Sequence, residues 1–163
     1  MQEISDFEGV LKSNGVQEAL RFLNARTPHR FTGVYRYDGT ILRNIVLFDQ
    51  HDPDIHHGDD FAMKDAPCAR VGEHGGRLVV EEFLSDPRFR RSFAPIVSYC
   101  GVLIRGPDGT PFGTVCHFDI KPCETPPNNA LLLEAVAPLV YSVLHRDYLN
   151  QGEAVAENRR LRT

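Results

Sequence analysis

Changes in hydrophobic periodicity divide this sequence into helical ends and a strand-rich middle, and this order constrains the fold most. Near the N-terminus, apolar residues recur at helical spacing in two runs separated by Asn14-Gly15: Ile4, Phe7, Val10 and Leu11, then Val16, Ala19, Leu20 and Leu23. Thr27-Pro28 ends the second run. Helical spacing returns at residues 130–148 as a broad apolar stripe, within which Pro138 predicts a kink.

The middle of the chain contains short apolar segments bounded by turn residues, as expected of an antiparallel sheet. Strands are predicted on both sides of Asp38-Gly39, a two-residue hairpin signal, and on both sides of the turn at 106–109. The predicted strands are 31–37, 40–48, 78–83, 98–104 and 112–120. These elements indicate an α+β fold with a central antiparallel sheet of about six strands, helices on its faces, and long N- and C-terminal helices.

The connections between these strands carry their own signals. A helix is predicted over 64–74, with Asp65 as its cap, Pro67 at an early position and Gly75-Gly76 at its end. The polar stretch 49–60 is interpreted as a loop, and Ser85-Asp86-Pro87 opens a turn or short helix that ends near Phe93.

Length and charge limit the classes of function. A chain of 163 residues suits one domain, and a formal net charge of −4 does not suggest nucleic-acid binding. The basic cluster at 159–162 is interpreted as a solvated tail. No apolar run is long enough to span a membrane and the N-terminus is acidic, so we expect a cytoplasmic protein with neither nucleic acid nor membrane as partner.

Three segments in the second half of the chain have a distinctive order. Residues 78–89 read LVVEEFLSDPRF, residues 98–104 read SYCGVLI, and residues 108–119 read DGTPFGTVCHFD. Together they resemble the GAF family, which has a strand with a D-P-R-F turn, an s-Y-a-G-v-P-l strand and a d-G-t-p-i-G-t-l-c-v-l-D hairpin. Leu103 stands where proline is usual, and His117 stands where an aliphatic residue is usual.

The resemblance covers about residues 15–148 and carries implications for domain organisation. It implies a 1–14 N-terminal helical extension, a 15–148 GAF domain and a 149–163 helical or flexible tail. It also implies a ligand pocket on one sheet face under connecting loops, and terminal helices that form a homodimer and pass a signal to a separate output protein. The expected function is therefore non-enzymatic sensing of a small molecule. No cofactor is assigned.

Positions on the matched segments predict a mostly apolar ligand pocket with polar contacts from Asp86 and Arg88. Asp86 can cap the turn after Pro87, which places Arg88 to pair with a carboxylate or with an anionic ligand. The expected ligand-binding residues are Phe48, Cys68, Val71, Asp86, Arg88, Phe89, Tyr99, Cys116 and Phe118. No catalytic residue and no metal ligand is assigned.

The cysteines leave alternatives open. Cys68 falls near the start of a predicted helix, where the helix dipole lowers the pKa of a thiol. It is either a buried structural residue or the nucleophile of an enzyme resembling the free methionine sulfoxide reductases of the GAF family. The cysteines which that branch carries between Leu78 and Tyr99 are missing here. A pure dimerisation or interaction module is the third function considered.

Cys100 and Cys116 lie on the two arms of one predicted hairpin. A register that mirrors about Asp108 sets them opposite each other on one sheet face, either as a redox pair or as two buried thiols. Cys123, beside Pro122, is expected to be exposed.

Two further patterns bear on cofactors. The loop residues 51–60 hold histidines and carboxylates that could bind a metal ion, or could form a solvated loop over the pocket. Cys116-His117 lies on a predicted strand rather than on a pocket helix, which argues against the bilin attachment of photoreceptor members. The N-K-x-x-F-x-x-x-D-E motif of the cyclic-nucleotide branch is absent.

Overall fold

A computed structural model describes the backbone of residues 2–161 and the side chains of residues 2–146. The chain begins with helices α1 (Gln2–Asn14) and α2 (Val16–Asn24), followed by strands β1 (Phe31–Asp38), β2 (Ile41–Asp49) and β3 (Phe61–Ala62). Two 3₁₀-helices follow, η1 (Met63–Asp65) and η2 (Pro67–His74). The remaining elements are β4 (Arg77–Val80), β5 (Ser98–Arg105), β6 (Pro111–Asp119) and α3 (Asn129–Leu161).

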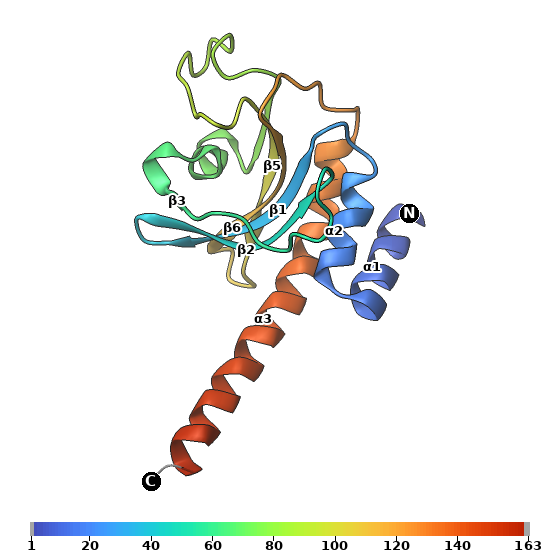
Figure 1. Cartoon of the computed structure of the whole chain (residues 1–163), viewed down its shortest axis with the longest axis vertical. Helices are drawn as coiled ribbons and strands as arrows, with labels where there is room; N and C mark the ends of the chain where they lie inside the picture. Colours follow the sequence, from blue (N-terminus) through green and yellow to red (C-terminus); the bar gives the residue numbers. More distant parts are fainter. Residues whose placement is uncertain (1, 162–163) are drawn as a thin grey trace.

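The strands form one six-stranded antiparallel sheet in the order β3-β2-β1-β6-β5-β4 (Figure 1). The predicted α+β class and the number of strands are thereby confirmed. β1 and β6, far apart in sequence, pair at the centre of the sheet, with Gly33 opposite Cys116. The β1–β2 hairpin extends the sheet on one side of this central pair, and the β5–β6 hairpin extends it on the other.

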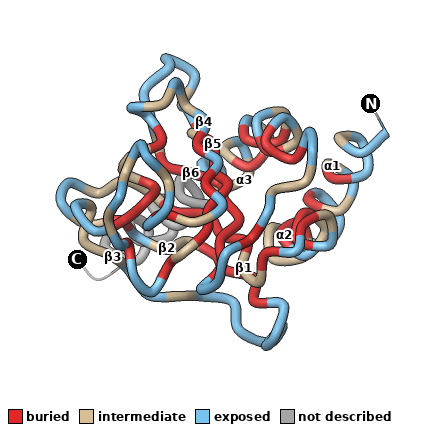
Figure 2. Tube along the Cα trace, turned by 90° about the horizontal axis from the view of Figure 1, so that it is seen from above, coloured by how far each residue is buried: buried red, intermediate tan, exposed pale blue. Residues whose placement is uncertain are grey.

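Each face of the sheet buries its own core. α1, α2 and α3 cover one face, here called the helix side, and the segment 61–97 covers the other, here called the segment side (Figures 1 and 2). Successive strand residues point to opposite faces, so Val34 lies in the helix-side core and Tyr35 lies in the segment-side core. Phe7 of α1 is fully buried on the helix side.

The segment predicted as a helix over 64–74 is a pair of 3₁₀-helices rather than one α-helix. Ala66 lies between them with extended backbone, because the residue before a proline disfavours helical dihedrals. The prediction that Asp65 caps the helix is also wrong, since Ala66 is the cap and no side chain bonds there. Gly75 does end η2, with a left-handed φ of 75°.

α3 is longer than the 130–148 predicted from its apolar stripe and projects beyond the sheet (Figure 1). Pro138 lies inside it and lacks the N–H that would bond to the carbonyl four residues earlier. The side chains of the predicted 149–163 tail lie outside the described residues, and the division into extension, domain and tail stays a prediction. None of the described helices is both long and apolar enough to cross a membrane.

Candidate functional site

Aromatic side chains hold the segment 61–97 against the sheet. The ring centroids of Phe83 and Phe93 lie 4.6 Å apart, and those of Phe89 lie 5.3 Å from Phe83 and 5.9 Å from Phe93. These separations are typical of favourable aromatic pairs. These three rings form an apolar cluster within the segment, and the cluster holds the segment in place over the segment side of the sheet.

Polar groups beneath this segment converge on Cys68. The hydroxyls of Tyr99 and Thr114 donate to its sulfur, with oxygen–sulfur distances of 3.2 and 3.1 Å. The Tyr37 hydroxyl donates to its carbonyl oxygen at 2.6 Å. The Cys116 thiol lies beside it and donates to the Gly33 carbonyl oxygen at 3.7 Å. Cys68 of η2 thus contacts side chains from β1, β5 and β6.

The two thiols of this cluster differ in acidity. Burial opposes the ionisation of Cys68, but the neighbouring Cys116 thiol and the hydrogen bonds from Thr114 and Tyr99 outweigh it and lower the pKa of Cys68 below its ordinary value. Burial raises the pKa of Cys116 well above its ordinary value, and the neighbouring Cys68 thiol adds to this. Cys68 is therefore the thiol of the pair that ionises more easily.

The structure brings most of the predicted ligand-binding residues together on the segment side: Cys68, Val71, Phe89, Tyr99, Cys116 and Phe118. Phe48 is not among them. It lies in the helix-side core, with the Arg21 guanidinium 5.2 Å from its ring centroid. Its neighbour Leu47 faces the segment side instead, because side chains alternate along a strand.

Two polar residues of this cluster, Tyr37 and Thr114, were not among the predicted ligand-binding residues. Thr114 lies two residues from Cys116 on β6, so strand alternation predicts both on one face. Tyr37 was not predictable in the same way, because its hydroxyl meets η2 only through the tertiary fold.

Asp86 and Arg88 lie on the exposed turn after β4 and pair with each other. Asp86 accepts from the Arg88 backbone N–H at 2.9 Å and from its Nε and Nη2 at 3.0 and 2.8 Å. Nη2 also donates to the Val79 carbonyl oxygen at 2.7 Å. These bonds lower the pKa of Asp86, with the Arg88 side chain as the main cause. Arg88 therefore pairs with a carboxylate of its own turn.

The prediction that Cys100 and Cys116 face each other is wrong. Cys100 pairs with His117, and Cys116 pairs with Gly101. A register shift between Ile104 and Arg105 moves the pairing by one residue, and a one-residue shift reverses the face of every side chain. Cys100 is consequently on the helix side and Cys116 is on the segment side. Cys123 is buried rather than exposed.

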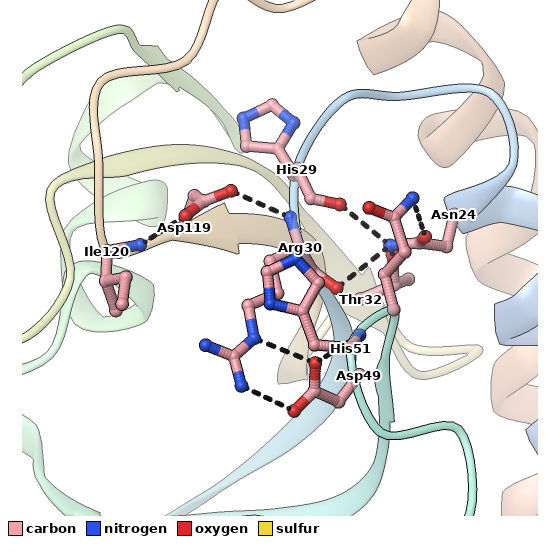
Figure 3. A network of polar contacts seen from close by, with 9 residues as sticks. Asn24, His29, Arg30, Thr32, Asp49, His51, Asp119 and Ile120 are labelled. Atoms are coloured by element: carbon pink, nitrogen blue, oxygen red, sulfur yellow. Dashed lines mark hydrogen bonds and ion pairs between the residues drawn. The ribbon is translucent and has the colours of Figure 1, made fainter.

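A buried polar network ties the ends of three strands to α2 (Figure 3). The guanidinium of Arg30 donates to both carboxylate oxygens of Asp49, at 2.9 and 3.0 Å. The backbone N–H of Arg30 donates to the Asp119 carboxylate at 2.9 Å. Asn24 donates to the His29 carbonyl oxygen and to Thr32, both at 3.0 Å. Since these groups bond to one another, the network's role is to fix the sheet against the helices.

Two histidines lie buried beside this network. The rings of His29 and His117 are stacked with their centroids 5.8 Å apart, and their Nδ1 atoms lie 2.5 and 2.6 Å from the hydroxyls of Thr27 and Thr32. Burial lowers the pKa of His29 to about 4 and that of His117 to about 3. Both imidazoles are therefore neutral at neutral pH.

Two cavities bounded by described residues lie away from the predicted ligand-binding residues. A helix-side cavity of about 730 Å³ is bounded by α2, β1, β2, β6, α3 and the loop after β2. A smaller one of about 300 Å³ lies between Gly75-Gly76 and α3. Among the described lining residues, neither cavity includes one predicted to bind a ligand. Within the described part of the chain, the 51–60 histidines and carboxylates form no cluster of three metal-ligating groups.

Solved structures with this fold include GAF domains and enzymes. The GAF domain of an Acinetobacter phosphoenolpyruvate-protein phosphotransferase superposes with a TM-score of 0.71 at 10% identity, covering 93% of this chain and 96% of that one. A type II free methionine-R-sulfoxide reductase from Thermoplasma acidophilum gives 0.60 at 17% identity, covering 86% and 96%. The chromophore-binding domain of a Stigmatella aurantiaca bacteriophytochrome gives 0.63 at 14% identity, covering 88% and 59%.

These likenesses establish the fold, and this chain has the fold of GAF domains. No family model matches the sequence, and no curated protein matches it either.

Proposed function

We propose that this chain is a non-enzymatic sensory domain that binds a small molecule on the segment side of its sheet. One observation carries the proposal: a few hydroxyl and thiol groups converge beneath the segment 61–97 on a face that is otherwise apolar. Small-molecule sites combine an apolar wall with a few placed polar groups in this way. The GAF fold supports the same function by analogy.

Ligand binding on this face requires the segment 61–97 to move. Tyr99 and Cys116 are fully buried, so a ligand reaches them only when the covering segment opens. That segment consists of short 3₁₀-helices, turns and two short strands at the sheet edges, elements with few ladder hydrogen bonds. Such elements open at a lower free-energy cost than the central strands do. Binding would thereby change the conformation of the segment, as a sensor requires.

The test is the retention of a ligand by protein purified without denaturation. We expect mass spectrometry to detect a bound small molecule, and Cys116→Leu to abolish its retention by filling the segment side. Cys100→Leu is the matched control, because Cys100 is an equally buried thiol on the opposite face. Circular dichroism confirms that both variants fold. Equal loss of the ligand in the two variants would contradict the proposed location.

A second candidate is a thiol-dependent reductase, favoured by the adjacent thiols of Cys68 and Cys116 and by the lowered pKa of Cys68. In that reaction two thiols give up two electrons and two protons, the sulfoxide oxygen leaves as water, and a Cys68–Cys116 disulfide forms. Two hydroxyls already donate to the Cys68 sulfur, and Cys68 is only 3% exposed. We therefore expect no turnover of free methionine-R-sulfoxide with dithiothreitol. Turnover that Cys68→Ser abolishes would establish the reductase instead.

Thiol accessibility gives a further prediction. All four cysteines are buried, with exposed fractions of 7% or less. A disulfide reagent such as 5,5′-dithiobis(2-nitrobenzoate) should therefore label the native protein slowly, at a rate limited by local or global opening. Labelling should become fast in denaturant. Rapid labelling of Cys68 in the native protein would contradict this and favour the reductase.

We further propose that the protein is a homodimer through its terminal helices and signals to a separate output protein through α3. The support is the length of α3, which continues past the sheet (Figure 1). Sequence places Val155 and Leu161 on this extension. Sedimentation equilibrium should give a dimer at micromolar concentration, and a monomer would exclude the proposed assembly.

A further inference from the structure

The helix-side cavity combines an apolar floor with a basic rim. Its apolar lining comes from α2, β2, β6 and α3: Val16, Ile45, Val46, Phe112 and Leu144. Its polar lining is Gln17, Arg36, Tyr37, His56, His57 and His145. No carboxylate is among the described lining residues. The volume of about 730 Å³ lies in the range of small-molecule sites.

The wall of this cavity is held in place without a ligand. The Gln17 side chain donates from Nε2 to the carbonyl oxygens of Leu47 and Ile55, at 3.1 and 3.3 Å. The Leu47 N–H in turn donates to the His56 carbonyl oxygen at 2.8 Å. These bonds fix the loop after β2 against α2 and β2, so the site is largely preformed.

Gln17 also presents an unmet acceptor. Its Oε1 is buried and has no hydrogen-bond donor among the described residues. Exchanging the amide's oxygen and nitrogen would not relieve this, because the oxygen would then face the carbonyl oxygens of Leu47 and Ile55. This acceptor is enclosed by the protein and out of reach of a ligand in the cavity, so Gln17 contributes to the site by ordering its wall.

Arg36 is the charged group of the cavity that is free to pair. Its nearest carboxylate, Asp38, lies 3.8 Å from its Nη2, which is beyond a hydrogen bond. Asp38 is instead bound by Arg43 at 2.9 Å. Within the described residues, no hydrogen bond is donated by the Arg36 guanidinium. An anion in the cavity would supply the missing partner.

We propose that this cavity binds an organic anion with an apolar body, whose carboxylate pairs with Arg36. The site is distinct from the segment-side site of the proposed function, and Tyr37 of β1 borders both. Leu144 and His145 place it where α3 leaves the sheet (Figure 1). A ligand here contacts the sheet and α3 together, which couples its binding to the position of that helix.

Isothermal titration with three related probes tests the proposal. 3-Phenylpropionate carries the apolar ring and the carboxylate, 3-phenylpropionamide lacks the charge, and propionate lacks the ring. We expect phenylpropionate to bind most tightly, and loss of the charge to weaken binding by about tenfold or more. Arg36→Gln should weaken phenylpropionate binding by a similar factor and remove the difference between acid and amide.

Three variants complete the design. Arg70→Gln, an arginine of η2 that pairs with Glu73 outside the cavity, should leave binding unchanged. Val16→Phe should abolish it by filling the cavity from the start of α2. Cys116→Leu, on the opposite face, should leave it unchanged, which separates this site from the one of the proposed function.

The proposal is overturned if no probe binds at millimolar concentration, or if Arg36→Gln and Val16→Phe leave binding intact. A second copy of the chain in the cavity is the competing occupant. In that case the wild-type protein would be a dimer that does not bind the probes, and Val16→Phe would convert it to a monomer in sedimentation experiments.

Discussion

Gly113→Ala is expected to destabilise the domain by about 3 kcal/mol or more. A Cβ at this position of β6 would overlap the carbonyl oxygen of Tyr35 and lie 2.9 Å from the Cα of Arg36. Both contacts are with the backbone of β1, so no side-chain rotation can relieve them. Because β1 and β6 are the central pair of the sheet, the two strands would have to separate. Urea unfolding followed by circular dichroism measures the effect.

Gly9→Ala is the matched control for this substitution. Gly9 lies in α1, and a Cβ there would meet nothing within 4 Å. Alanine favours a helix interior over glycine, so stability should rise by up to about 1 kcal/mol. A Gly113→Ala protein as stable as the wild type would show that β1 and β6 do not approach as closely as described.

Lowering the pH from 6.5 towards 4.5 is expected to remove on the order of 5 kcal/mol of stability through His29 and His117. Their folded pKa values of about 4 and about 3 lie below the ordinary value of 6.5. The unfolded chain therefore binds more protons in this window. The stabilisation is fully present above the unfolded pKa and is lost as the pH falls through 6.5 towards the folded values.

His117→Gln tests the source of this pH dependence. Glutamine cannot titrate, so the variant should lose about half of the slope of unfolding free energy against pH. Urea titrations at several pH values between neutral and acid give the slopes of the wild type and the variant. An unchanged slope in His117→Gln would contradict the burial of a neutral imidazole pair.

Periodicity predicted the long elements of the fold and the short strand β4, but not β3 or the 3₁₀-helices. β1, β2, β5 and β6 each have eight or nine residues, enough to show strand composition between turn signals. β3 has two residues, too few for any pattern. The 3₁₀ character of η2 was not readable either, because its proline start and glycine end also suit an α-helix.

The candidate sites depended on register and tertiary contacts that sequence does not encode locally. The shift between Ile104 and Arg105 decided which face Cys116 occupies. Alternation along β2 placed Phe48 on the helix side. The helix-side cavity was invisible in the sequence, because Gln17, Arg36 and His56 come from separate elements with no shared motif.

The central claim is that the protein binds a small molecule on the segment side without converting it. Its most direct test is an amide chemical-shift titration of ligand-free protein with the molecule recovered from the purified wild type. We predict saturable shifts at Val71, Tyr99 and Cys116, with the ligand recovered unchanged. Shifts confined to other parts of the fold, or chemical conversion of the added molecule, would contradict the claim.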